Sequence, residues 1–177
     1  MTTEFTQDFF QLFGLPRRFA MDSQQLEQSW RAAAAAVHPD RYASHPDAQK
    51  RVALMQATRV NEAYQTLKNP LRRGRYLLSL HGVDTQEESN TRMPTDFLMA
   101  QMEWRENIAD ASQGGNLEAL EDLSRQLRAE TRDLVARLEQ ALDVTADLDA
   151  ATVLVRKLRF LEKLDQEIGD GIESLLA

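Results

Sequence analysis

The first residues of this sequence whose types could do chemistry stand in the tripeptide His38-Pro39-Asp40. A histidine and an aspartate two positions apart could serve as a proton-transfer pair. However, no nucleophile motif and no glycine-rich phosphate loop accompanies them. The three histidines, His38, His45 and His81, lack the spacing of a metal site, and the chain has no cysteine. We therefore expect no enzyme, no metal and no cofactor, and we interpret the tripeptide as a binding loop.

The composition indicates that helices position this loop. The chain has 24 leucines and 22 alanines, against eight valines and three isoleucines. Leucine and alanine favour helices, whereas β-branched residues favour strands, so the sequence predicts an all-α protein. No apolar run reaches 18 residues, and the start, MTTEFTQDFF, lacks a basic targeting segment. We expect a cytoplasmic protein with no membrane contact.

The charge divides the chain into two parts. Residues 1–80 carry 11 basic and 7 acidic residues, whereas residues 81–177 carry 10 basic and 21 acidic ones. Opposite signs predict two modules with different partners, and an acidic second half disfavours nucleic acid. The polar, aperiodic stretch 81–93 is the predicted linker. The expected domains are therefore 1–80 and 94–177.

In the first domain, proline positions and apolar spacing predict a helical hairpin. A short helix is expected over 9–12, and a second begins at the N-cap Asp22 and ends before Pro39. Two more are expected over 46–67 and 71–80. The hairpin would present the His38-Pro39-Asp40 loop between its two long helices.

The second domain is predicted to be an antiparallel three-helix bundle. Helices are expected over 94–112, 117–142 and 147–176. The seven-residue spacing of Leu120, Leu127 and Leu134 also fits an intermolecular coiled coil. The short breaks at 113–116 and 143–147 favour packing within one chain.

The surroundings of the tripeptide resemble the J-domain family. DFFQLFGL lies upstream at 8–15, and NEAYQTLKNPLRRGRY lies downstream at 61–76. In that family, a hairpin of two long helices presents an HPD loop. The downstream segment is similar to the third-helix signature of J-domains, with matches at Asn61, Ala63, Tyr64, Leu67, Pro70, Arg73 and Tyr76.

The resemblance implies a co-chaperone that docks on a DnaK-type ATPase and biases it toward hydrolysis. Asp40 would offer a charge-assisted acceptor, His38 a hydrogen-bonding ring, and Pro39 a fixed loop. Arg41 and Arg31 are the nearby bases expected at the chaperone-binding surface. Unlike most J-domains, this chain has only one base, Arg31, between residues 22 and 37. Weak electrostatic steering favours a dedicated chaperone over a general one.

The whole chain resembles the HscB family, the J-domain co-chaperones of iron–sulfur cluster biogenesis. The resemblance lies in RRGRYLLSLHG at 72–82, DFLMAQMEWRE at 96–106 and VRKLRFLEKL at 155–164. The glycine- and phenylalanine-rich linker and the zinc repeats of general J-proteins are absent, and the lack of a CxxC module fits a bacterial form. The implied partners are an HscA-like chaperone and an IscU-like scaffold. A J-domain adaptor for a different client remains the alternative.

The helix expected over 94–112 carries two apolar stripes. At about 100° per residue, one contains Phe97, Trp104 and Ile108, and the other Leu98, Met99 and Met102. One neighbour does not readily bury both, although a thick bundle would. Phe160 lies off the core line of the last helix, so we expect it and the methionine stripe to be exposed. The resemblance places scaffold binding at Leu98, Met99, Met102, Glu103, Glu106 and Phe160, with Asp110 as a shorter acid nearby.

Overall fold

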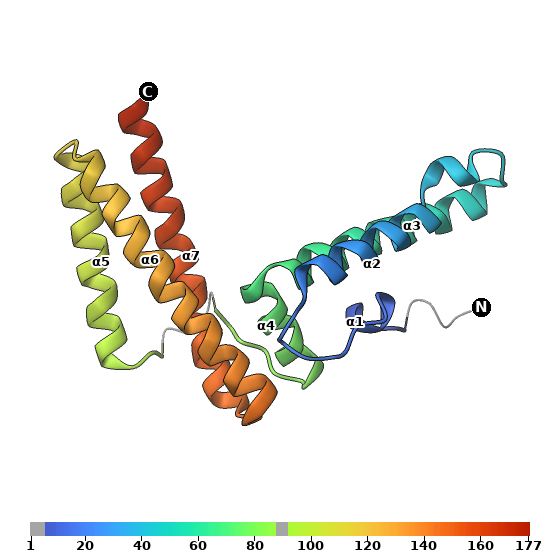
Figure 1. The fold of residues 1–177 in the computed structure, drawn as a ribbon, viewed down its shortest axis with the longest axis horizontal. Coiled ribbons are helices and arrows are strands. Elements are labelled where there is room, and N and C mark those ends of the chain that lie inside the picture. The colour runs from blue at the N-terminus through green and yellow to red at the C-terminus, as the bar shows by residue number, and fades with distance from the viewer. Residues whose placement is uncertain (1–5, 88–91) are drawn as a thin grey trace. The chain divides into compact units, whose positions relative to one another are not determined.

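The computed structural model describes residues 6–87 and 92–177, and every regular element in these two ranges is helical (Figure 1). This confirms the all-α prediction. The chain divides into two compact units, Met1–Leu80 and His81–Ala177. None of the described helices is long and apolar enough to cross a membrane.

The first unit contains the expected hairpin and the two short helices beside it. The helices begin and end within two residues of the predicted bounds. They are α1 (Phe9–Leu12), α2 (Ser23–Ala36), the 3₁₀ helix η1 (Pro39–Tyr42), α3 (Asp47–Lys68) and α4 (Pro70–Leu80).

Side-chain caps explain where α1 and α2 begin. The Asp8 carboxylate accepts a hydrogen bond from the Gln11 N–H at 2.8 Å, and the Gln11 side chain accepts one from the Asp8 N–H at 2.9 Å. This reciprocal capping box satisfies two donors that the first turn leaves unpaired. The carboxylate of Asp22 accepts from two N–H groups of the first turn of α2, as the sequence predicts for an N-cap.

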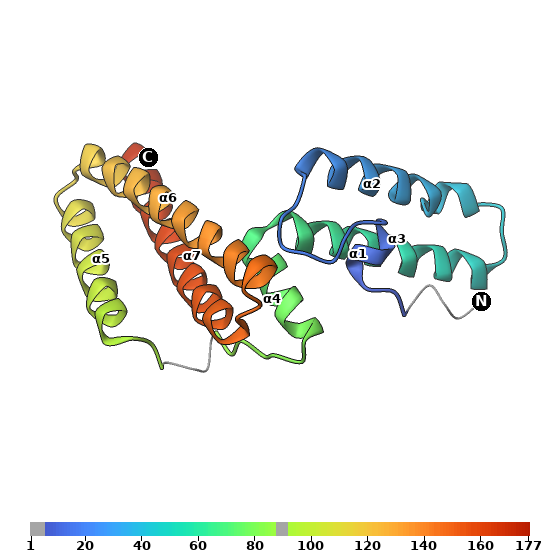
Figure 2. The ribbon, with the colours of Figure 1, turned by 60° about the horizontal axis from the view of Figure 1, so that its bottom comes forward.

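The hairpin of α2 and α3 is held by one aromatic contact and a buried strip of small and branched residues. The rings of Trp30 and Tyr64 stack with centroids 4.3 Å apart. The Trp30 Nε1–H donates to Asn61 Oδ1 at 3.1 Å. Leu26 from α2 and Val60 from α3 are buried in the core of this unit. Figure 2 shows the two helices running antiparallel, joined by the loop that carries the tripeptide.

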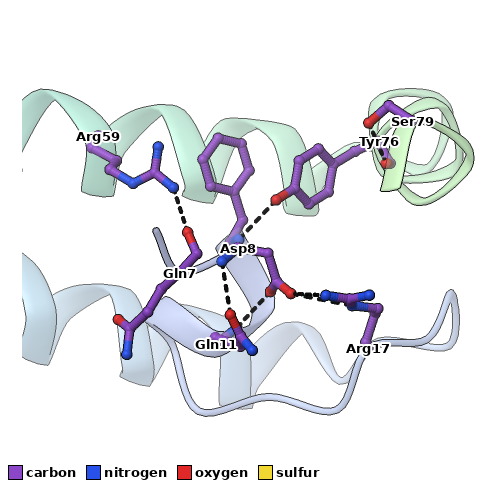
Figure 3. A network of polar contacts seen from close by, with 8 residues as sticks. Gln7, Asp8, Gln11, Arg17, Arg59, Tyr76 and Ser79 are labelled. Atoms are coloured by element: carbon purple, nitrogen blue, oxygen red, sulfur yellow. Dashed lines mark hydrogen bonds and ion pairs between the residues drawn. The ribbon is translucent and has the colours of Figure 1, made fainter. Parts of the chain in front are cut away.

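Tyr76 of α4 attaches α1 to the rest of the unit (Figure 3). Its ring stacks on Phe9 at 4.6 Å, and its hydroxyl oxygen accepts the Phe9 N–H at 2.9 Å. Arg59 of α3 completes the contact, because its guanidinium lies 5.2 Å from the Phe9 ring centroid and also donates to the Gln7 carbonyl. Burial raises the pKa of the Tyr76 hydroxyl, and the nearby Asp8 carboxylate raises it further.

The second unit is the expected three-helix bundle, made by α5 (Thr95–Gln113), α6 (Leu117–Glu139) and α7 (Leu148–Leu176). The α6 leucines at seven-residue spacing are buried within this chain, which agrees with intramolecular packing. Asn116 and Asp147 cap α6 and α7 by accepting N–H groups of the first turns at 3.0 Å.

The end of α6 differs from the prediction of one helix to residue 142. The α-helical bonding stops at Glu139, and a single π-helical segment, η2 (Gln140–Val144), follows. The Thr145 N–H bonds to the Gln140 carbonyl at 3.0 Å, which widens the last turn. Ala141 stays in the core at 6% exposure. The wider turn therefore lets the chain leave α6 while this alanine remains packed.

The predicted linker 81–93 is partly packed. Residues 88–91 lie outside the described residues. In the preceding stretch, Thr85 is only 2% exposed, and its carbonyl accepts the Arg156 Nε–H at 2.8 Å. Residues 81–87 thus belong to the second unit, with Thr85 fastened to α7.

The first prediction concerns the ion pair at the start of α1. The Arg17 guanidinium lies 2.5 Å from the buried Asp8 carboxylate. Burial alone would raise the pKa of this carboxyl, but the Gln11 N–H and Arg17 together hold it below its ordinary value. Asp8→Asn keeps an N-cap and removes the charge, so it should destabilise the protein at pH 7. Asp8→Ala also removes the cap and should cost about 0.5–2 kcal/mol more.

The pH dependence of unfolding tests whether the lost charge of Asp8 causes the destabilisation expected for Asp8→Asn. The pKa of Asp8 is lower in the folded protein than in the unfolded chain. The charged carboxylate therefore contributes fully to the free energy of unfolding above the unfolded-state pKa, and this contribution is lost as pH falls through the lower, folded-state value. Urea unfolding of wild type and Asp8→Asn should therefore differ most at neutral pH and converge in acid. An equal difference at both pH values would contradict this.

Candidate functional site

The tripeptide His38-Pro39-Asp40 occupies the loop between α2 and α3. α2 cannot continue through Pro39, because proline lacks an N–H group and its ring clashes with the preceding turn. Pro39 instead opens η1, with His38 as its N-cap. The His38 Nδ1 accepts the Asp40 N–H at 3.3 Å. In the neutral ring with Nδ1 as acceptor, the Nε2–H is the donor available to a partner.

The next two residues fasten the loop to the end of α2. A guanidinium nitrogen of Arg41 donates to the Ala35 carbonyl at 3.3 Å, and the Tyr42 hydroxyl donates to the Ala36 carbonyl at 3.5 Å. These carbonyls belong to the last turn of α2, where no further helical N–H groups are available. The positive charge of Arg41 also suits the negative end of the helix. The loop is therefore braced by its own side chains.

Tyr42 is a residue that sequence reasoning missed. Its ring also lies 5.1 Å from the ring of His45, so His45 contributes to the loop's structure. The only signal was an aromatic hydroxyl six residues after the end of an alanine run.

Within the described residues, no group of three or more histidine, aspartate or glutamate side chains could hold a metal ion.

The loop presents its polar groups to solvent. The side chains of His38 and Asp40 are 59% and 91% exposed, and the His38 Nδ1 lies 3.6 Å from an Asp40 carboxylate oxygen. Such a carboxylate can accept charge-assisted hydrogen bonds from a cationic partner. Arg31, the other predicted base, lies 2.6 Å from the Glu27 carboxylate in the same helix. Glu27 and Arg31 are the only charged residues of α2, so this helix carries no net charge.

The second predicted surface lies on α5. We define the α5 patch as Leu98, Met99, Met102, Glu103 and Glu106. Leu98 is 40% exposed, Met99 67% and Met102 73%, and both glutamates are exposed. The opposite stripe faces the bundle, with Phe97 and Ile108 buried and Trp104 half-buried. The predicted division of α5 into two apolar stripes is confirmed, and only one of them is core.

Phe160 does not share this exposure, and the prediction that it is exposed is wrong. It is 8% exposed and meets Phe97 edge to face, with ring centroids 5.7 Å apart. The Arg105 guanidinium lies 5.4 Å from its ring centroid. α7 packs against α5 as well as α6, so its buried arc is wider than the leucine line alone indicates. Phe160 faces this second neighbour.

The aromatic pair under the α5 patch attaches α5 to α7. The Lys157 ammonium lies 5.3 Å from the Phe97 ring centroid, and this contact is the reciprocal of the one that Arg105 makes with Phe160. Each helix thus places a cation over an aromatic ring of the other. On the α6 side, α5 borders a shallow cavity of about 180 Å³, lined by Ala100, Glu103, Trp104, Asn107, Leu123 and Gln126.

Comparisons with known proteins agree with both halves of this arrangement. A family model described as the DnaJ domain matches residues 8–76, and one described as the HSCB C-terminal oligomerisation domain matches residues 93–169. The "Co-chaperone protein HscB homolog" of Chromobacterium violaceum is 72% identical over 99% of both chains. The protein of the same name from an Azoarcus species is 47% identical over 99% of both chains.

Solved structures show the same fold. "Chaperone HscB from Vibrio cholerae" has a TM-score of 0.85 at 35% identity, and covers 96% of this chain and 99% of that one. The human co-chaperone protein HscB has a TM-score of 0.87 at 29% identity, over 93% of this chain and 81% of that one. With a DnaJ domain in its first unit and an end-to-end match in its relatives, the chain belongs to the HscB family of co-chaperones.

Proposed function

We propose that this protein stimulates the ATPase of a dedicated, HscA-like chaperone of the DnaK type and delivers an IscU-like scaffold to it during iron–sulfur cluster maturation. The observation that carries the proposal is the pairing of two exposed surfaces on separate units, the braced loop and the α5 patch. An adaptor needs one surface for each partner. The role is non-enzymatic and belongs to the bacterial cytoplasm.

The loop supports docking on the ATPase because its backbone is braced before binding. Arg41 and Tyr42 already hold it against α2, so little conformational entropy is lost when a partner engages His38 and Asp40. To bias the ATPase, this contact must be stronger in one conformation of the chaperone than in the other. An exposed carboxylate can meet that requirement when a partner cation moves into reach in only one conformation.

The α5 patch suits a protein client. Met99 and Met102 are flexible, polarizable side chains that adapt to a partner surface. Glu103 and Glu106 flank them and favour a partner with basic residues around an apolar centre. Binding on the second unit would keep the client close to a chaperone held by the first, which raises the client's effective concentration.

The lack of net positive charge on α2 supports a dedicated chaperone. Its only base, Arg31, is already paired with Glu27. Long-range attraction to an acidic ATPase surface is then weak. A J-domain adaptor for another client shares every feature of the loop and differs only at the α5 patch, so scaffold binding distinguishes the two.

The second prediction concerns the loop. Asp40→Asn and His38→Gln should abolish stimulation of the chaperone ATPase while leaving helicity and scaffold binding unchanged, because both side chains are largely exposed. Steady-state ATP hydrolysis with increasing co-chaperone measures the effect. Glu62→Gln, an exposed acid-to-amide change on α3, is the matched control and should behave as wild type. Full stimulation by Asp40→Asn would refute this role of the loop.

The third prediction concerns the α5 patch. Replacing Leu98, Met99 and Met102 together by alanine should weaken scaffold binding at least tenfold, about 1.4 kcal/mol, without lowering the melting temperature. Calorimetric titration beside a thermal melt measures both. Val144→Ala, at a residue 67% exposed in η2, is the control for a generic loss of apolar surface.

Unlike the triple variant, Phe160→Ala should lower the melting temperature. Because the ring is buried against Phe97, truncation should cost about 3–5 kcal/mol of stability. If the triple variant melts early, the α5 patch is core. If it melts normally and binds normally, the scaffold assignment fails.

A further inference from the structure

An exposed leucine on α3 has no role in the function proposed above. Leu54 is 58% exposed, although leucine is among the residues most often buried. It lies in the half of α3 that follows the loop. Its neighbour Met55 is exposed to the same extent, 57%, but one residue later the helix has turned by about 100°. The two side chains therefore project in different directions.

The contact between Trp30 and Asn61 fixes the direction of Leu54. Asn61 receives the Trp30 Nε1–H, so this side of α3 faces the edge of α2. Leu54 precedes Asn61 by seven residues, which is close to two helical turns, and so projects on the same side. Because the helices are antiparallel, two turns back along α3 corresponds to two turns forward along α2 (Figure 2). That position is Val37, directly before His38.

The alanine run of α2 leaves Leu54 uncovered. At the level of Asn61 a tryptophan covers α3, but beyond it α2 offers only the methyl groups of its alanine run and then Val37, which is level with Leu54. These side chains are too short to shield a leucine that projects along the edge of the neighbouring helix. An apolar side chain thus stands in solvent beside the point where α2 ends and the loop begins.

We propose that Leu54 is a docking residue for the DnaK-type chaperone, forming an apolar surface that is continuous with the His38-Pro39-Asp40 loop. This inference rests on the proposed function and adds its recognition chemistry. Arg31 is the only base of α2 and is paired, so the partner gains little from charge attraction there. Apolar contact at Leu54 supplies affinity in its place and selects a chaperone with an apolar, rather than strongly acidic, surface next to its loop-binding site.

Charge-reversed substitutions at one position test this. Leu54→Asp and Leu54→Lys, in the full chain, should both raise the concentration needed for half-maximal ATPase stimulation at least tenfold, because complete burial of a leucine is worth more than that. An electrostatic effect would instead move the two variants in opposite directions. Met55→Asp, equally exposed on another side of the same helix, should leave the concentration unchanged. Circular dichroism confirms that each variant folds.

The outcomes separate this inference from the function beneath it. If Asp40→Asn abolishes stimulation while both Leu54 variants stimulate as wild type, the loop docks without Leu54 and the inference is overturned. If Asp40→Asn stimulates fully, the proposed function itself fails. If the Leu54 variants change only the molecular mass in sedimentation and not the stimulation, the surface joins two copies of the chain and the inference is again overturned. Equal losses in Met55→Asp and Leu54→Asp would also contradict it.

Discussion

The stacking of Trp30 on Tyr64, with the indole N–H on Asn61, sets the register of the hairpin on which the J-domain depends. The remaining residues of α2 near the loop are alanines, whose methyl groups could slide along α3 at little cost. A single large ring with a directed hydrogen bond removes that freedom. Once this register is set, helix geometry determines where α2 ends, where the loop lies, and which residue of α3 lies beside the loop.

The residues that carried the family resemblance are the ones that hold this unit together. Asn61 and Tyr64 fix α2 against α3, and Ala63 and Leu67 are fully buried. Arg73 places its guanidinium 4.5 Å from the Phe19 ring and donates to the Leu67 carbonyl, which ties α4 to the end of α3. Tyr76 then holds α1. The signature residues are therefore the ones that make contacts between helices, and for this reason the signature predicted the fold of this unit.

Helix bounds were predictable because prolines and caps act locally, whereas burial depends on how many neighbours a helix has. A helical wheel placed Phe160 off the leucine line of α7 correctly, but it carried no information that α5 packs there as well. The π-helical end of α6 has the same origin, because it keeps Ala141 in contact with the bundle. Thr85 looked like linker from its polar surroundings, and only its bond with Arg156 reveals its attachment. Each of these depends on a residue distant in the sequence.

Both candidate surfaces are built in the same way, with exposed binding groups held from below by buried or bonded ones. Under the loop, Arg41 and Tyr42 grip the carbonyls of α2, and under the α5 patch, Phe97 and Phe160 lock α5 to α7. The separation has a physical reason. A group that binds a partner must stay solvated in the free protein, and so it cannot also stabilise the fold by burial. Neighbouring residues therefore hold the binding group in place, as buried Phe97 does for exposed Leu98. Truncation of one such residue is expected to lower stability, and truncation of the residue next to it to lower affinity for the partner.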